Sequence, residues 1–173
     1  PPAFDRTEAV FRYTYPLDSL VQALKFRDEL PVARFFAGHM AERLREAGMS
    51  GDRIDRILPM PLHPQRLRER GFNQAGEIAR HLAHTLAIPV AHGALVRNRN
   101  AAPQAGLPLK SRIRNLRGAF TGVGDLSGMR VALVDDVMTS GASMHELAKA
   151  ARAAGAVEVA AWVVARTLPA AWR

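Results

Sequence analysis

Two adjacent aspartates, Asp135 and Asp136, follow an apolar run and precede a turn rich in hydroxyl groups. The stretch over residues 131–143 reads VALVDDVMTSGAS. The apolar run predicts a buried strand that brings both carboxylates to the edge of a sheet. Two neighbouring ionised carboxylates need hydroxyl donors or a cation, which a ribose diol and Mg²⁺ supply. The pair is therefore predicted to be catalytic, to hold a ribose and to bind Mg²⁺ directly or indirectly, with a solvated strand end as the alternative.

The turn after the aspartates has the composition of a phosphate site. It is predicted to bind a phosphate through Thr139, Ser140, Gly141, Ala142 and Ser143. Gly141 can adopt backbone angles that other residues avoid, and the start of the following helix offers free N–H groups and a partial positive charge. A second interpretation remains for one residue, because Ser143 and Glu146 form an S-x-x-E pattern that is typical of a helix capping box.

Hydrophobic periodicity predicts the elements that must position these residues. Helical spacing predicts helices over residues 17–26, 31–47, 73–86 and 143–154, and strands are predicted over 10–15, 56–61, 130–134 and 157–165. Short strands are also expected within residues 89–96 and around Phe120, whereas residues 62–72 are turn-rich and 97–110 form a loop. Unbroken apolar strands that alternate with helices favour an α/β fold with a mainly parallel sheet.

The composition excludes several classes of protein. The chain has 173 residues, about the size of one domain, and 48% of them are hydrophobic, which argues against disorder. It has no cysteine, so disulfides and thiolate zinc sites are excluded within it, and a cytoplasmic protein is expected. No apolar run approaches the roughly 20 residues of a membrane helix, so no membrane insertion is expected. The formal net charge of +8 attracts phosphates, whether on nucleotides or on nucleic acid.

The stretch VALVDDVMTSGAS resembles the phosphoribosyl diphosphate (PRPP) signature of type I phosphoribosyltransferases. Further segments resemble the ComF/GntX family, the competence-associated phosphoribosyltransferase-like proteins. They are ALKFR at residues 23–27, LPMPLHP at 58–64, RLRERGFNQ at 66–74, PQAGL at 103–107 and RIRNLRGAF at 112–120. Two features depart from the family pattern. The turn reads TSGAS where TTGAT is commoner, and the four-cysteine zinc segment that often begins family members is absent, either because it was removed or because this relative lacks it.

The resemblance implies a type I phosphoribosyltransferase fold. It would be one domain over residues 1–173, with a central, mainly parallel sheet flanked by helices and a small hood, and residues 1–50 would supply the hood strand and flanking helices. The phosphate bound by residues 139–143 would be the 5-phosphate of PRPP. Two groups of pyrophosphate-binding candidates are also implied. The first is Arg66, Arg70, Gly71, Asn73 and Gln74, and the second, on a mobile catalytic loop, is Arg97, Arg99, Gln104, Arg112 and Arg114. A solvated basic surface remains an alternative for the arginines, and a helix N-cap remains one for Asn73.

The resemblance further implies the function. The protein is expected to bind PRPP or a nucleotide with Mg²⁺ and to transfer the phosphoribosyl group to an unknown acceptor, in competence and the uptake of transforming DNA. A different class of function remains open, in which the same fold is non-catalytic and assists DNA uptake by binding single-stranded DNA and a helicase-like ATPase. The charge of +8 suits that alternative, although few aromatic residues lie among the arginines.

Overall fold

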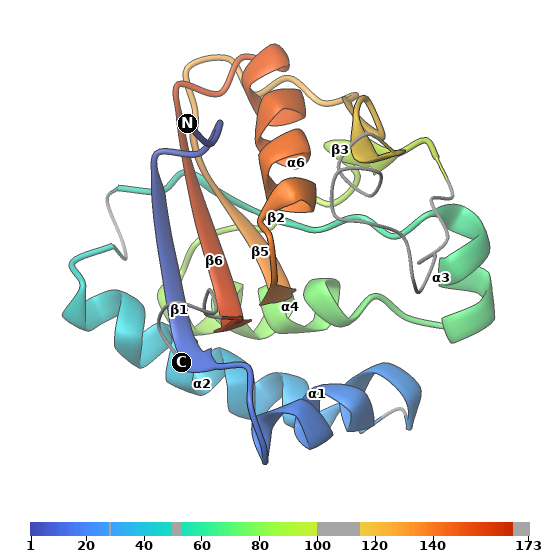
Figure 1. The fold of residues 1–173 in the computed structure, drawn as a ribbon. Coiled ribbons are helices and arrows are strands. Elements are labelled where there is room, and N and C mark those ends of the chain that lie inside the picture. The colour runs from blue at the N-terminus through green and yellow to red at the C-terminus, as the bar shows by residue number, and fades with distance from the viewer. Residues whose placement is uncertain (28, 50–52, 100–114, 168–173) are drawn as a thin grey trace.

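A central sheet of four parallel strands organises the computed structural model of the chain, which describes residues 1–27, 29–49, 53–99 and 115–167 (Figure 1). The strand order is β1-β6-β5-β2, and all three neighbouring pairs are parallel. The strands are β1 (Arg6–Arg12), β2 (Arg56–Pro59), β5 (Arg130–Met138) and β6 (Glu158–Arg166). The parallel α/β sheet expected from the sequence is confirmed.

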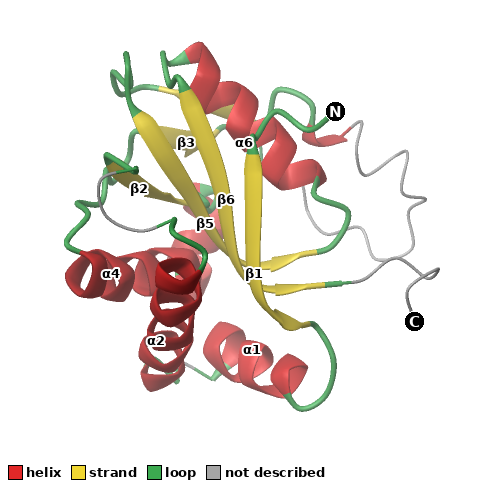
Figure 2. Cartoon of the chain, turned by 90° about the vertical axis from the view of Figure 1, so that its left-hand side faces the viewer, coloured by secondary structure: helices red, strands yellow, loops and turns green. Residues whose placement is uncertain are grey.

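Helices cover both faces of the sheet (Figure 2). One face carries α1 (Leu17–Phe26), α2 (Pro31–Glu46) and α4 (Gln74–Leu86). The other carries α6 (Ala142–Ala153) and a small antiparallel sheet of β3 (Leu95–Arg97) and β4 (Phe120–Gly122). The helices predicted over residues 17–26, 31–47, 73–86 and 143–154 are therefore confirmed. No helix in the described ranges is long and apolar enough to cross a membrane.

Strand β5 contributes to both hydrophobic cores because its side chains alternate between the two faces. Ala132 and Val134 belong to the cluster under α1, α2 and α4, whereas Val131 and Leu133 belong to the cluster under α6. The strand was predicted to end at residue 134, but it pairs with β6 as far as Met138. The two aspartates therefore lie within the strand, near its carboxyl end.

The N-terminal strand is part of the central sheet. A hood strand was predicted over residues 10–15, but β1 spans Arg6–Arg12 and pairs in parallel with β6, from Arg6 beside Ala160 to Arg12 beside Arg166. Most of its side chains are half-buried, so the alternation that marks a strand is weak and the predicted bounds were wrong. The described part of residues 1–49 therefore contributes an edge strand and two helices to the central layers rather than a hood.

A helix occupies part of the segment predicted to be turn-rich. Helix α3 (Pro64–Arg70) begins after His63, whose Nδ1 accepts a hydrogen bond of 3.3 Å from Gln65 N–H. It ends at Gly71, which adopts the left-handed conformation with φ of 82°. None of its residues is buried. A short helix without a buried stripe leaves no hydrophobic periodicity in the sequence, which explains why the prediction was wrong here.

Candidate functional site

Asp136 is buried in an ion pair with the end of α1. Its side chain is 4% exposed, and its Oδ2 lies 2.8 Å from Nζ of Lys25. The other oxygen, Oδ1, accepts a hydrogen bond of 2.7 Å from Val137 N–H. Strand alternation accounts for this placement, because Asp136 shares the face of Ala132 and Val134, on which α1 packs. The protein itself therefore supplies one of the cations that the aspartate pair requires.

Asp135 precedes Asp136 on β5 and is half-buried. Its Oδ1 accepts a hydrogen bond of 2.9 Å from Asp136 N–H. Burial of the carboxyl group and the neighbouring charge of Asp136 raise the pKa of Asp135 well above its ordinary value, and the charge of Lys25 opposes that rise. Additional hydrogen-bond donors would stabilise the ionised form of this carboxyl group, and the hydroxyls of a sugar are suitable donors.

The turn between β5 and α6 presents the start of a helix. Thr139 and Ser140 are exposed, and the N-cap residue is Gly141, with φ of 76° in the left-handed region. Gly141 has no side chain to accept hydrogen bonds from the first-turn N–H groups, and Ser140 Oγ accepts only weakly from Ala142 N–H, at 3.4 Å. The free N–H groups of the first turn and the positive end of the helix dipole are therefore available to an anion bound at this turn.

Ser143 is not a helix cap. It is the second residue of α6, after the N-cap Gly141. Glu146 accepts a hydrogen bond of 2.9 Å from Gly118 N–H and lies 3.2 Å from Nζ of Lys149, so it does not complete a capping box. The capping-box interpretation is therefore wrong, and the half-buried hydroxyl of Ser143 lies in the first turn of the helix.

Helix α3 carries Arg66 and Arg70 on one face, since the two residues are one helical turn apart. Burial lowers the pKa of Arg70, while the nearby charge of Asp136 raises it and that of Arg66 lowers it. The guanidinium carbon of Arg70 also lies 5.5 Å from the ring centre of Phe26, at the end of α1. Arg68, between the two, lies on the opposite face and is exposed. Charges from α3 and β5 therefore meet at the carboxyl end of the sheet.

Three candidates that follow Arg70 shape this segment. Gly71 ends α3, and Asn73 is the N-cap of α4, where its Oδ1 accepts a first-turn N–H at 3.1 Å. The Nδ2 of Asn73 donates to Met60 O at 3.0 Å. Gln74 is buried, and its Oε1 accepts a hydrogen bond of 2.5 Å from Arg70 Nη1. The structure therefore supports the cap interpretation of Asn73 and shows that Gln74 orients Arg70.

Arg97, at the end of β3, reaches the same group of charges. Burial lowers the pKa of Arg97, the charge of Arg66 lowers it further, and the charge of Asp135 raises it. Its guanidinium carbon lies 5.6 Å from the ring centre of Phe120, which supports the side chain from the neighbouring strand. Arg66 therefore interacts with both Arg70 and Arg97, and these two arginines, from separate segments, interact with Asp136 and Asp135 respectively.

One of the remaining loop candidates lies in the described part of the chain, where the backbone O of Arg99 accepts a hydrogen bond of 3.3 Å from Arg97 Nε. Arg99 is exposed and donates to Arg117 O at 3.5 Å. The last three predicted residues, Gln104, Arg112 and Arg114, lie outside the described residues.

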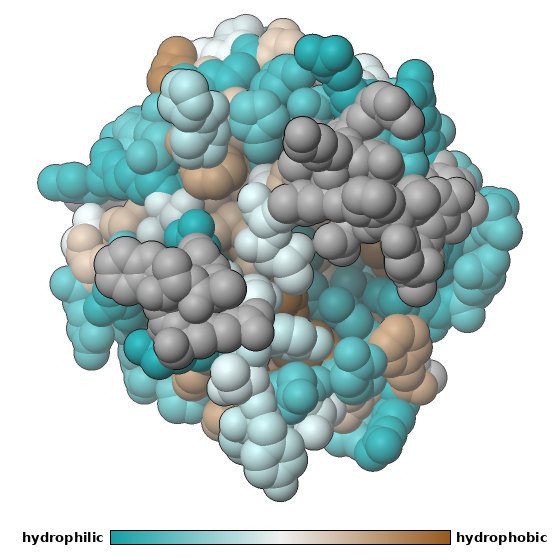
Figure 3. Space-filling view, in the orientation of Figure 1, coloured by the Kyte–Doolittle hydropathy of each residue, from teal (hydrophilic) through white to brown (hydrophobic). Residues whose placement is uncertain are grey.

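Two cavities adjoin the aspartates and the turn, and each includes a residue to which the sequence assigned no role. A cavity of about 310 Å³ between α1 and α3 includes Lys25 and Phe26. A cavity of about 520 Å³ beside Gly141 includes Arg166, at the end of β6. The space-filling view is hollowed near the end of β5, with hydrophilic side chains around part of the hollow (Figure 3). In the sequence, Lys25 could have been found as a site residue because it lies in the ALKFR motif. Arg166 could have been found only from its position after an apolar strand.

Comparisons with known proteins identify the family. Residues 67–170 match the phosphoribosyl transferase domain family. Competence protein F of Haemophilus influenzae is 32% identical over 170 residues, which are 95% of this chain and 74% of the relative. DNA utilization protein YhgH of Salmonella typhi is 36% identical over 172 residues, which are 97% of this chain and 75% of the relative. Among solved structures, glutamine PRPP amidotransferase from B. subtilis, complexed with ADP and GMP, is similar over 76% of this chain and 26% of that chain, with 25% identity and a TM-score of 0.48.

These matches agree with the motifs that meet at the site. The domain match covers more than half of the chain, and both relatives exceed 30% identity over nearly its whole length. The segments ALKFR, RLRERGFNQ and VALVDDVMTSGAS supply Lys25, Arg66, Arg70 and the aspartate pair. The chain therefore belongs to the phosphoribosyl transferase domain family and, within it, to the ComF/GntX family of competence-associated proteins.

Proposed function

We propose that the chain binds PRPP as its magnesium complex at the carboxyl end of the central sheet. One observation carries the proposal: β5 places a carboxylate pair directly before the N-terminus of α6, Arg70 interacts with Asp136 and Arg97 with Asp135, and Arg66 interacts with both arginines. The turn suits the 5-phosphate, Asp135 suits the ribose hydroxyls, and Arg66, Arg70 and Arg97 suit the diphosphate. Ligands of open parallel sheets bind at this end of the strands.

The residues present suit Mg²⁺ when the ligand brings most of the coordination. Asp135 and Asp136 offer carboxylate oxygens, but Oδ2 of Asp136 is paired with Lys25. Within the described ranges, no group of three or more His, Asp or Glu side chains is placed to hold a metal ion. Mg²⁺ is commonly held by one or two carboxylates together with phosphate oxygens and water. We assign it to the diphosphate, with Asp135 as the available protein carboxylate; bound there, the ion would neutralise charge on the leaving group.

The same arrangement suits transfer of the phosphoribosyl group. The bond between C1 of the ribose and the diphosphate oxygen breaks, and its electron pair leaves with the diphosphate. The nucleophile of the acceptor forms the new bond to C1 and releases its proton to solvent or to an aspartate. Arg66, Arg70 and Arg97 would stabilise the charge on the leaving diphosphate, while Asp135 holds the ribose. The acceptor remains to be identified.

Isothermal titration calorimetry of the full chain with PRPP and Mg²⁺ tests the proposal. Wild-type protein is expected to bind PRPP more tightly with Mg²⁺ than without it. Arg66→Met is expected to weaken PRPP binding about tenfold or more, because a charge-assisted contact with the diphosphate is lost. The same variant should bind ribose 5-phosphate like the wild type, since that ligand has no diphosphate.

The matched control is Arg68→Met, which removes an exposed arginine from the opposite face of the same helix. It should bind both ligands as the wild type does. Absence of PRPP binding by the wild type would overturn the proposal, and equal losses in the two variants would overturn the assignment of Arg66 to the diphosphate.

We further propose a role in the use of DNA by the cell, which rests on the names of the relatives, competence protein and DNA utilization protein. A non-catalytic role with single-stranded DNA and a helicase-like ATPase is the second candidate, favoured by the net charge of +8. Titration with a labelled single-stranded oligonucleotide at several salt concentrations tests it. Direct contact predicts an affinity that falls steeply with salt and survives the addition of PRPP. No binding at low salt would exclude direct contact.

A further inference from the structure

The C-terminal end of α1 contacts both charged halves of the site. Lys25 forms the 2.8 Å ion pair with Asp136 of β5, and the next residue, Phe26, lies under the guanidinium of Arg70 at 5.5 Å. These contacts join three segments that are far apart in the sequence, and Figure 1 shows α1 and α3 on the same side of the molecule near the end of β5. One helix end therefore touches the acidic pair and the basic helix together.

Packing alone does not explain the side chains at this position. Phe26 is 67% exposed, although large aromatic side chains are usually buried, and its ring contacts an arginine instead of a hydrophobic core. The side chain of Lys25 is 23% exposed and that of Asp136 is 4% exposed. If either residue were removed, little water could reach the charge of the other. A buried ion pair adds little to the free energy of folding, because the cost of desolvating both charges offsets their attraction. Stability alone therefore does not account for the pair of Lys25 and Asp136.

We propose that Lys25 is a positioning residue that sets the recognition of the ribose hydroxyls through Asp136, an inference that rests on the proposed function. Oδ1 of Asp136 accepts a hydrogen bond from Val137 N–H at 2.7 Å, whereas Oδ2 is held by the ion pair with Lys25 and has no hydrogen-bond partner among the described residues. The backbone N–H of Asp136 is in turn held by Oδ1 of Asp135 at 2.9 Å. Lys25 therefore fixes one carboxylate, and through the backbone between them it fixes the orientation of the Asp135 carboxylate.

This arrangement gives the two aspartates different tasks. Asp136 is anchored and neutralised by Lys25, whereas Asp135 is the carboxylate left to accept hydrogen bonds from a vicinal diol. A carboxylate recognises two neighbouring hydroxyls only when its position is fixed, because both hydrogen bonds depend on its orientation. Without Lys25, Asp136 loses its ion-pair partner and keeps only the weaker interaction with Arg70, so its carboxylate is held less firmly and Asp135 loses its fixed orientation. The preference for ribose over 2-deoxyribose is then expected to fall.

Calorimetry of the full chain with ribose 5-phosphate and 2-deoxyribose 5-phosphate tests the inference. The wild type is expected to prefer ribose 5-phosphate by about 10- to 100-fold, as expected for a hydrogen bond to a charged group. Lys25→Met should reduce this preference to less than about threefold. Lys25→Arg keeps a cation at the position and should restore most of the preference. Lys149→Met is the matched control, because Lys149 forms an exposed ion pair with Glu146 and should leave the preference unchanged.

The outcomes separate the two proposals. If the wild type binds neither sugar phosphate, the proposed function fails and the inference fails with it. If the wild type prefers ribose 5-phosphate and folded Lys25→Met shows the same preference, the role of Lys25 is overturned and the proposed function stands. Should Lys25→Met fail to fold, the double variant Lys25→Met with Asp136→Asn removes both charges of the pair. It must also lose the preference, and an unchanged preference in it overturns the inference equally.

Discussion

Replacing Asp135 with asparagine is expected to weaken PRPP binding by roughly 10- to 100-fold and, at the same time, to increase the free energy of unfolding at pH 7. Binding weakens because an amide is a poorer acceptor for two ribose hydroxyls than a carboxylate, and a hydrogen bond to a charged group is lost. Stability rises because burial and the charge of Asp136 raise the pKa of Asp135, so its ionised form destabilises the folded chain.

The pH dependence follows from the direction of that shift. The folded state binds the proton of Asp135 more tightly than the unfolded state does, so this carboxyl group reduces stability as the pH rises above 3.8, and the loss is complete above its folded pKa. Urea unfolding of the wild type and Asp135→Asn from pH 4 to pH 8 should show a stability difference that grows with pH in favour of the variant. A variant less stable than the wild type at pH 7 would contradict this account.

Asp125 provides a control of opposite sign. Hydrogen bonds from Ser127 lower the pKa of Asp125, so its contribution to stability is present at neutral pH and is lost as the pH falls through its folded pKa. Asp125→Asn should therefore be less stable than the wild type at pH 7, with a difference that vanishes in acid. It should leave PRPP binding unchanged, since Asp125 lies in an exposed loop before β5.

The layers of the fold could be predicted because they leave periodic patterns in the sequence. Strands β5 and β6 are covered on both faces, so both read as nearly continuous apolar runs. Helix α4 places Ile78, Leu82 and Leu86 on one buried stripe, and the spacing of those residues predicted it. The turn between β5 and α6 could be predicted as well, because a strand, an acid pair, a turn and a helix that are consecutive in the sequence remain neighbours in space.

The rest of the site depends on contacts between distant segments, which no local pattern records. The ion pair of Lys25 with Asp136 joins α1 to β5, and the stacking of Arg70 on Phe26 joins α1 to α3. Asn73 could not be assigned from the sequence, because the residue types that cap helices are also those that bind ligands. The hydrogen bonds of Asn73 in the structure identify it as the N-cap of α4. The ends of β1 were placed wrongly because its half-buried side chains carry little alternation.

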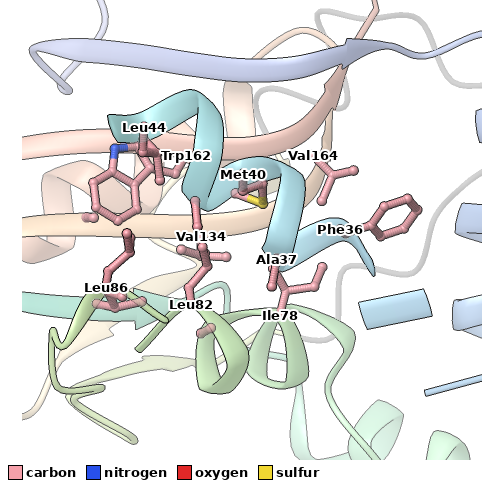
Figure 4. Close-up of a cluster of buried hydrophobic side chains, with 14 of the residues drawn as sticks. Phe36, Ala37, Met40, Leu44, Ile78, Leu82, Leu86, Val134, Trp162 and Val164 are labelled. Carbon is pink, nitrogen blue, oxygen red and sulfur yellow. The ribbon is translucent and has the colours of Figure 1, made fainter. Parts of the chain in front are cut away.

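Trp162→Ala is expected to cause the largest loss of stability, about 3–5 kcal/mol, by emptying the centre of the core beneath α2 and α4. The indole is fully buried, and Figure 4 shows it among the side chains of Leu44 and Leu86. Trp162 lies in register with Val134, two residues before Asp136 on β5. Loss of this packing should therefore also loosen the strand that holds the aspartates, and PRPP binding should weaken with stability.

Trp162→Phe separates lost packing from lost polarity. Among the described residues, the indole Nε1 of Trp162 has no hydrogen-bond partner, although it is buried. An unsatisfied buried N–H costs about 1–3 kcal/mol, and phenylalanine removes that cost while filling much of the same space. The loss of stability in Trp162→Phe is therefore expected to be less than half of that in Trp162→Ala, measured by urea unfolding followed by circular dichroism. Equal losses would show that the indole N–H is satisfied, so that its removal does not offset the lost packing.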